Sequence, residues 1–173
     1  MKSLEEQMAF YAAYHRHPMN RATHFVGVPI IIYAIMVILA VPPMRLDVGL
    51  PFALSPTLAL ICAVLVYYFL LDSVLALAMV VVFGALFAAA EWTAAQGLMT
   101  ALAAFGVAFV GGWIIQLVGH GVWEKRKPAL AANLFQVFVS PIFLVAEVFF
   151  ALGLKRKVHD AVEALVPQHL PPA

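Results

Sequence analysis

The sequence predicts an all-α membrane protein, a bundle of several spanning helices, and two observations carry that prediction. First, 65% of the 173 residues are hydrophobic, only 11% are charged, and the mean hydropathy is +0.99. Soluble domains have about 45–50% apolar and about 25% charged residues, and a chain of this length cannot bury so much apolar surface in a water-soluble core. Second, long apolar runs follow one another at about 24–41, 54–71, 73–90, 97–123 and 134–154. A net charge of +1 provides no field for a polyanion, so nucleic-acid binding is excluded.

The segment before the first run predicts a helix that lies on the membrane surface. Ser3 and Glu6 have the spacing of a capping box, which opens a helix. Pro18 should end that helix, because proline lacks the backbone N–H that a helix interior needs. We therefore expect an interfacial helix over residues 4–17. A soluble-type amphipathic helix fits the same pattern.

Each apolar run approaches the length of a spanning helix, about 20 residues with a range of about 17–25. Asp72 and Ser73 leave room only for a very tight turn between the second and third runs. The 91–97 segment, which contains Trp92, is expected to be a short polar break at the membrane interface. The single cysteine, Cys62, lies inside a run and cannot form an intramolecular disulfide.

The lysines and arginines predict how the runs cross the membrane. If four runs span and the N-terminus is inside, only Arg45 lies outside and the other nine basic residues lie inside, as the positive-inside bias favours. The fifth run, 134–154, must then enter and leave on the same side. Ser140 and Pro141 interrupt this run near its middle, which favours a re-entrant helical hairpin. The alternative is a fifth full span.

We expect the chain, 1–173, to form a single membrane domain. It divides into an N-terminal interfacial helix with a ligand loop (1–23), the membrane bundle (24–154) and a polar tail (155–173). Short loops without a retention signal favour a multi-pass protein of a bacterial inner membrane, with the endoplasmic reticulum as the alternative in a eukaryote. The sequence does not indicate an oligomeric state.

Four spans inserted in this way bring three histidines to the cytoplasmic face. His15 and His24 flank the start of the first run, and His120 lies at the inner end of the fourth. Imidazole and carboxylate are the usual ligands of zinc and of non-haem iron. These histidines could therefore supply three nitrogens to one metal ion. Glu124 would be a fourth ligand, or a partner that fixes the tautomer of His120, or simply the counter-charge of a nearby lysine.

The end of the fourth run carries further polar groups in register with His120. Gln116, His120 and Glu124 are spaced by four residues, so they share one face of a helix. Trp113 lies one turn further back on nearly the same face. A pattern of this kind predicts a polar stripe that faces the other candidate ligands.

Other polar side chains have simpler interpretations. His17 near the interface and His159 and His169 in the tail are expected to be solvated. Gln136 and Glu147 lie within the fifth run, where polar groups are expensive. We expect them to make structural hydrogen bonds that hold the hairpin to the bundle.

Two function classes remain open besides a metal-dependent oxygenase. A small transporter or channel would use Gln136 and Glu147 to line a path, but transporters more often have inverted repeats and broken helices in both halves. A zinc-dependent lipid hydrolase would use the same ligands as the oxygenase. Haem ligation by two histidines is disfavoured, because the histidines lie at one end of the bundle and not face to face inside it.

Three blocks of residues together form a known pattern. They are Tyr14-His15, Asn20, His24 and Gly27-Val28-Pro29; then Gly112-Trp113, Gln116, Gly119-His120, Glu124 and Lys127-Pro128-Ala129-Leu130; then Asn133-Leu134, Gln136, Pro141-Ile142-Phe143 and Glu147-Val148. Over about residues 8–160 the chain resembles the membrane-bound 2-hydroxy fatty acid dioxygenase family of phytosphingosine breakdown. It departs from the family pattern at Leu117 and Ile142, and neither position is a candidate ligand.

The resemblance implies an activity and a ligand set. It implies an Fe(2+)-dependent α-oxidation, in which a 2-hydroxy fatty acid loses its carboxyl carbon to dioxygen and becomes one carbon shorter. It also implies that the metal-binding histidines are His15, His24 and His120, and it leaves the role of Glu124 open. The substrate would be drawn from the lipid bilayer.

The chemistry of the residues agrees with that implication. A 2-hydroxy acid can chelate a metal through its hydroxyl and one carboxylate oxygen, and three protein ligands leave positions open for the chelate and for dioxygen. Asn20 and Gln116 are expected to donate hydrogen bonds to the substrate, while Tyr14 and Trp113 shape the pocket. We also expect one of two arginines to attract the carboxylate. These are Arg16 and Arg21.

Overall fold

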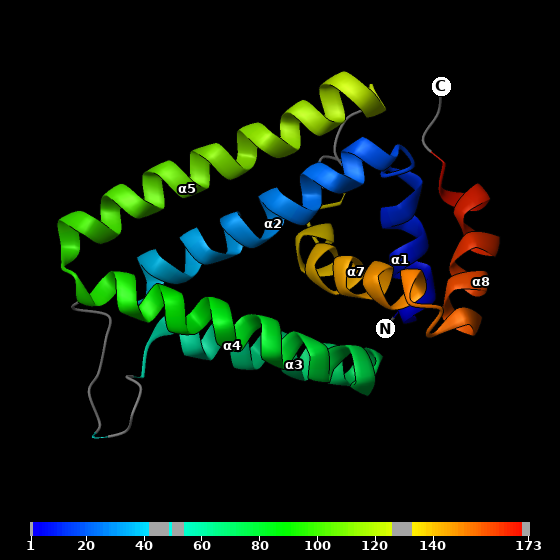
Figure 1. Cartoon of the computed structure of the whole chain (residues 1–173). Helices are drawn as coiled ribbons and strands as arrows, with labels where there is room; N and C mark the ends of the chain where they lie inside the picture. Colours follow the sequence, from blue (N-terminus) through cyan, green and yellow to red (C-terminus); the bar gives the residue numbers. More distant parts are fainter. Residues whose placement is uncertain (1, 42–48, 50–53, 126–132, 171–173) are drawn as a thin grey trace.

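The computed structural model describes residues 2–41, 49, 54–125 and 133–170, and the described chain is a bundle of helices (Figure 1). Arg45, Arg126 and Lys127, which entered the expected membrane orientation, lie outside the described residues. In chain order the elements are α1 (Leu4–Ala13), α2 (Pro18–Leu39), α3 (Pro56–Leu71), α4 (Ser73–Ala95), α5 (Leu98–Val118), the π-helix η1 (Gly119–Glu124), α7 (Gln136–Ala151), α8 (Arg156–Leu165) and the 3-10 helix η2 (Val166–His169).

The long helices form two pairs that diverge toward one end of the molecule. α2 runs beside α5, and α3 runs beside α4 (Figure 1). The pairs meet at the end where α4 turns into α5, and there the Tyr33 hydroxyl lies 2.7 Å from that of Thr93. At the opposite end α7 and α1 lie between the pairs, and α8 lies on the outer side of α1 (Figure 1). The all-α membrane bundle expected from the sequence is therefore confirmed.

Three of these helices are long and apolar enough to cross a membrane: α2, α4, and α5 together with η1. The fourth expected span, α3, is also apolar, but with 16 residues it is shorter than a spanning helix usually is. α7 is long enough to cross a membrane only when it is joined to the segment of α8 and η2 that follows it, and the two parts are bent by 120°. Since chain direction alternates from α2 to α5, the N-terminus of α2 and the C-terminus of α5 lie at the same end (Figure 1).

Small residues allow α2 and α5 to approach each other closely. A Cβ on Gly27 would lie 2.8 Å from Gln116 Cγ, and a Cβ on Gly112 would lie 2.7 Å from Ile31 Cγ1. Both distances are shorter than side chains tolerate. Glycine at such a crossing brings helix backbones together, a common device in membrane bundles. Here it brings the end of α5 against the start of α2.

The N-terminal region differs from the expectation of one helix over 4–17. The capping box is present, but α1 ends at Ala13 and α2 already begins at Pro18. Proline is favourable at the first position of a helix, where no N–H bond is lost, so Pro18 opens a helix instead of only ending one. The first long helix therefore begins six residues before the predicted start of the run at His24. The short turn between the two helices contains His15.

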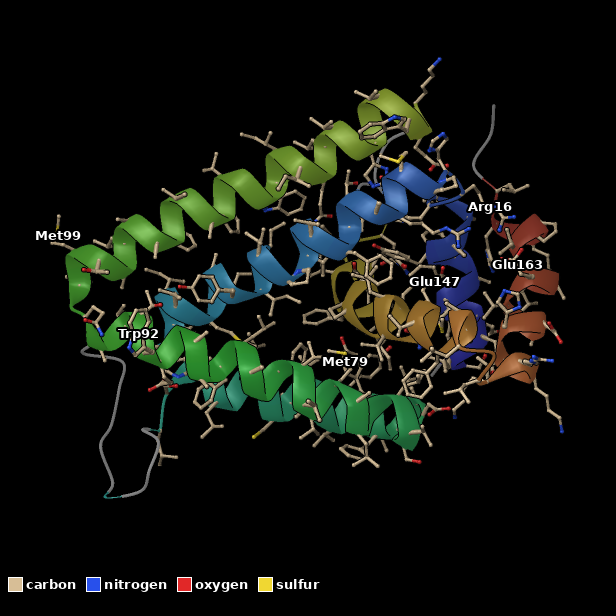
Figure 2. The ribbon with its side chains drawn as sticks, viewed as in Figure 1. Arg16, Met79, Trp92, Met99, Glu147 and Glu163 are labelled. Atoms are coloured by element: carbon tan, nitrogen blue, oxygen red, sulfur yellow. The ribbon has the colours of Figure 1, made fainter. Side chains whose placement is uncertain are left out.

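α1 packs against protein on two sides and not only along one stripe. It contacts both α7 and α8, and Met8, Ala9 and Ala13 are fully buried (Figure 1). An ion pair between Arg16 and Glu163, 3.0 Å apart, joins the start of α2 to α8 (Figure 2). The predicted surface helix is thus enclosed between two other helices.

The prediction of a helix break at Ser140 and Pro141 is wrong, because α7 runs without interruption through both residues. Pro141 is only the sixth residue of the helix, and it removes a single intrahelical hydrogen bond. The chain turns instead after Ala151, where Gly153 has φ +73°. The N–H groups of Gly153 and Leu154 donate to the carbonyls of Phe150 and Phe149, at 2.9 and 2.8 Å. This pattern is a Schellman motif, which ends helices at glycine.

The polar break expected over 91–97 is also shorter than predicted. α4 continues to Ala95, so that Glu91 and Trp92 are helical. Gly97, with φ +109°, makes the turn into α5. Trp92 is 69% exposed and projects outward near this turn (Figure 2), which is consistent with the expected interfacial position.

Candidate metal centre

Three histidines from separate parts of the chain meet at one end of the bundle. His15 lies in the turn between α1 and α2, His24 lies in the second turn of α2, and His120 lies in η1. One nitrogen from each lies within 4.8 Å of the others, and the side chains are only 2%, 2% and 3% exposed. Metal–nitrogen bonds of about 2.0–2.1 Å require ligand nitrogens within about 4.2 Å of one another. A small closure of this cluster would therefore hold one metal ion.

Hydrogen bonds fix which nitrogens of His15 and His24 face the cluster. His15 Nδ1 lies 2.6 Å from the carbonyl oxygen of Tyr11, and His24 Nδ1 lies 2.8 Å from that of Asn20. A carbonyl only accepts, so each neutral ring donates from Nδ1 and keeps a lone pair on Nε2. The two Nε2 atoms are 3.2 Å apart. Two lone pairs at that distance repel each other unless a cation or a proton lies between them, so this donor set fits a metal.

His120 completes the cluster, and neither of its ring nitrogens has a partner. Both nitrogens are buried without a hydrogen bond, which costs free energy unless something else binds them. Its ring centre lies 4.8 Å from that of His15 and 5.0 Å from that of His24, with the planes nearly perpendicular. η1, which carries this residue, is a π-helical turn at the end of α5. Such turns are rare and occur frequently at functional sites.

Tyr11 and Ser140 support His15 from the side, and the sequence analysis did not single them out for this role. The ring of Tyr11 stacks on that of His15 with centroids 3.8 Å apart and planes 8° apart. The hydroxyls of Tyr11 and Ser140 lie 2.7 Å apart. Burial and the neighbouring His24 hold the pKa of His15 well below its usual range, so this ring is neutral and ready to bind a metal. The four-residue spacing from Tyr11 to His15 was the available signal.

Glu124 organises the turn that carries His15. One carboxylate oxygen accepts from the backbone N–H of Arg16 at 3.2 Å, and the other accepts from that of His17 at 2.9 Å and from Asn20 Nδ2 at 3.2 Å. Charge-assisted hydrogen bonds of this kind are stronger than neutral ones. The predicted spacing thus does bring Glu124 beside the histidines. It does so as an anchor for the start of α2, and Glu124 is not part of the cluster of three histidines.

A cavity, partly open to its surroundings, adjoins the cluster. The three histidines line its polar end together with Gln116, Trp113, Gln136 and Ser140. Its apolar wall includes Val28, Ile31, Ile32, Ile35, Leu117 and Val137. The cavity therefore has a polar head next to the cluster and an apolar extension along α2.

The predicted substrate contacts divide into two groups. Gln116 and Trp113 line this cavity, as expected. Asn20 does not line it, and acts behind the cluster through Glu124 and the carbonyl that fixes His24. Tyr14 is also not among the lining residues, and its ring packs against Phe10 with centroids 5.2 Å apart.

The arginines expected to attract a carboxylate are engaged elsewhere. Arg16 pairs with Glu163. Arg21 donates to the carbonyl of His15 at 2.9 Å and to Glu147 at 2.7 Å. Glu147 therefore staples α7 to α2, which is the structural role that the sequence favoured for it (Figure 2). The described residues that line the cavity include no aspartate, glutamate, lysine or arginine.

The remaining histidines lie outside the cluster. His17 caps α2, with its Nδ1 accepting from the N–H of Met19 at 3.2 Å. His159 lies on α8 beside Asp160, and His169 packs against Phe10. The cluster that could hold a metal thus contains His15, His24 and His120 and excludes His17, which was expected at the same membrane face.

Comparison with known proteins agrees with these findings. The family model described as "2-hydroxy-palmitic acid dioxygenase Mpo1-like" matches residues 1–152. The chain belongs to the Mpo1-like family. It is 32% identical over 162 residues to the 2-hydroxy-palmitic acid dioxygenase MPO1 of Saccharomyces cerevisiae, across 92% of this chain and 87% of the yeast protein. No solved structure matches the chain. The family resemblance predicted from the three sequence blocks is therefore confirmed.

Proposed function

We propose that this Mpo1-like protein is an iron(II)-dependent dioxygenase that shortens 2-hydroxy fatty acids by one carbon. One dioxygen molecule balances the reaction, since the hydroxy acid becomes the shorter acid, carbon dioxide and water. The buried cluster of His15, His24 and His120 carries the proposal, because it stands at the polar end of an apolar cavity. The yeast relative, by its name, acts on 2-hydroxy-palmitic acid.

The donor set suits iron(II) in this role. Three neutral imidazoles leave positions free, as the open sites of non-haem iron oxygenases require. Bound iron would supply redox activation of dioxygen, which zinc cannot provide. The same ligands would also bind zinc, so the family membership, and not the ligand geometry, favours the oxygenase over the hydrolase.

Charge balance in the cavity favours an anionic ligand. A divalent ion held by three neutral rings keeps both of its charges, and the described cavity wall offers no carboxylate to compensate them. Isolated charge is costly in a buried site. A 2-hydroxy acid brings one negative charge and two oxygen donors, so it would compensate one of the two charges without any help from Arg16 or Arg21.

The chain's own residues would orient and enclose this substrate. Tyr11 and Asn20 hold the imidazoles through their carbonyls, and Glu124 keeps the turn between α1 and α2 in place. Gln116 would donate a hydrogen bond to the carboxylate, and Trp113 would exclude water from it. The acyl chain would lie along the apolar side of α2.

The arrangement also suggests how the substrate is drawn from the bilayer. Leu117 on α5 and Val137 on α7 line the cavity and are 53% and 45% exposed, so an acyl chain would pass from lipid between them. The described basic residues near the cluster lie at the ends of the long helices. The positive-inside bias therefore favours the cytoplasmic side for the metal centre, in a bacterial inner membrane or a reticulum membrane.

The transporter alternative loses its main support. It required Gln136 and Glu147 to line one path, but Glu147 is paired with Arg21 and is not among the residues that line the cavity.

Turnover of 2-hydroxypalmitate tests the proposal. The purified protein would be loaded with iron(II) without oxygen, mixed with the substrate and exposed to air. We expect consumption of one dioxygen per pentadecanoate formed, and no pentadecanoate from palmitate or from zinc-loaded protein. Absence of pentadecanoate from iron-loaded protein that retains its fold would overturn the proposal.

A further inference from the structure

Gln136 lines the cavity of the histidine cluster and carries an unpartnered polar group. It is the first residue of α7, is 4% exposed, and its Oε1 is buried without a hydrogen bond. Buried amides are normally hydrogen-bonded. The sequence favoured a structural hydrogen bond for Gln136, but none is present at Oε1. An unpaired acceptor on a residue that lines this cavity indicates that a ligand supplies the missing donor.

The other polar groups on the same face of α7 are already occupied. Ser140 lies one turn after Gln136 and therefore shares its face, but its hydroxyl pairs with that of Tyr11. The ring nitrogens of the cluster are expected to face the metal. Gln136 Oε1 is thus an uncommitted acceptor on a residue that lines the cavity.

Gln136 also lies next to other polar side chains. This residue stands between the histidine cavity and a second cavity that Lys2, Gln7 and Asn133 line. The apolar wall of the first cavity extends away along α2, through Val28 and its neighbours. A fatty acid with its chain along that wall would place its polar end next to Gln136.

We propose that Gln136 recognises the 2-hydroxyl group of the substrate, with Oε1 accepting its hydrogen bond. The inference rests on the proposed function, because it takes the substrate class from there. At neutral pH a 2-hydroxy acid has a single O–H donor, its hydroxyl, while an unsubstituted fatty acid has none. A site built to hydrogen-bond a hydroxyl rejects the analogue that lacks it, because the buried acceptor then remains unpaired. Gln136 is therefore a specificity-determining residue.

Replacement by methionine tests this assignment, since methionine has similar length and no acceptor of comparable strength. Binding of 2-hydroxypalmitate and of palmitate would be measured by calorimetry on anaerobic, iron-loaded protein, so that turnover does not enter. We expect the native protein to prefer 2-hydroxypalmitate, and Gln136→Met to reduce that preference by about tenfold or more. The affinity for palmitate and the iron content should stay unchanged.

Two further variants complete the design. Gln7→Met removes another buried amide, which lines only the second cavity and whose side chain is bonded to Tyr67 and to the Lys2 carbonyl. It should leave the preference intact even if it lowers stability. Gln136→Asn keeps a polar group but withdraws the acceptor, and it should reduce the preference in a protein that folds even where the methionine variant does not.

The outcomes separate this inference from the proposed function. An undiminished preference in either folded variant of Gln136 would overturn the role of Gln136 and leave the dioxygenase proposal standing. Equal binding of the two acids by the native protein would overturn the inference and would count against the proposed substrate class as well.

Discussion

Gly119→Ala should push η1 away from α2 immediately beside a ligand. A Cβ at this position would lie 2.1 Å from Thr23 Oγ1 and 2.6 Å from Asn20 Oδ1. Ordinary contact begins at 3.4 Å, so the first pair must separate by 1.3 Å, the difference between 3.4 and 2.1 Å. The displaced segment carries His120, the next residue in the chain.

The neighbouring side chains have little freedom to yield. Thr23 is β-branched, which restricts its rotamers, and its hydroxyl donates to the Asn20 carbonyl at 2.7 Å. Asn20 is fully buried, and its amide nitrogen donates to Glu124. The overlap must therefore be relieved by movement of the helices themselves.

Gly119→Ala should lower both the stability of the fold and the affinity for iron(II). Overpacking of this kind costs about 1–3 kcal/mol of stability. Metal sites accept deviations of about 0.2 Å in ligand distance, so a shift near 1 Å should weaken iron(II) binding by at least about tenfold. Anaerobic iron titration and thermal unfolding in detergent would measure the two quantities.

Gly121→Ala is the matched control, because it flanks His120 on the other side. A Cβ there meets nothing within 4 Å. This variant should keep native iron affinity and stability. Equal iron affinity in the Gly119→Ala and Gly121→Ala proteins would refute the argument that close packing of η1 on α2 places His120.

Three further predictions concern the groups around the centre. Glu124→Gln should lower the free energy of unfolding by about 1.5–3 kcal/mol, because it weakens charge-assisted hydrogen bonds, yet retain full iron stoichiometry; loss of iron at saturating metal would show instead that Glu124 is a ligand. Tyr11→Phe and Ser140→Ala should each cost about 0.5–1.5 kcal/mol, and the double variant less than their sum, since they remove one shared hydrogen bond; strict additivity in denaturant unfolding would contradict this coupling. Burial raises the pKa of Asp72, but the Lys155 ammonium and the first N–H groups of α4 outweigh it and hold that pKa below its usual value. The pair therefore stabilises the fold fully above the unfolded-state pKa of about 3.9, and this stabilisation is lost as pH falls through the lower folded-state pKa. Lys155→Met should thus be less stable than the native protein at neutral pH and equally stable at acid pH. A loss of stability that persists at acid pH would exclude the ion pair as its cause.

Much of the fold could be predicted because the bilayer imposes strong rules on sequence. Long apolar runs can only be helices when lipid surrounds them, and the tight turn at Asp72 was visible because no room remained between two runs. The positions of the helix ends were harder to predict. Pro18 and Pro141 both suggested breaks, but proline is also compatible with the first turns of a helix, and only the tertiary contacts decide between these roles.

The metal centre was predictable to the extent that topology placed its residues at one end. His15, His24 and His120 were found in this way, and the structure brings them together. Glu124 was expected beside them, but the supporting roles of Tyr11 and Ser140 were not predicted, because they depend on side-chain directions. Whether Arg21 faces a substrate or Glu147 depends on how α7 packs beside α2. That packing could not be predicted, because the sequence pattern suggested a break inside α7 that the helix does not have.

Metal content is the most direct test of the three-histidine centre. Protein loaded with iron(II) without oxygen would be freed of loosely bound metal and analysed, together with the single alanine variants of His15, His24, His120 and His159. We predict about one tightly bound iron per native chain and per His159→Ala chain, and none in the other three variants, all of which should keep native helix content. Full retention of iron in the folded His15→Ala, His24→Ala and His120→Ala proteins would contradict the existence of this centre.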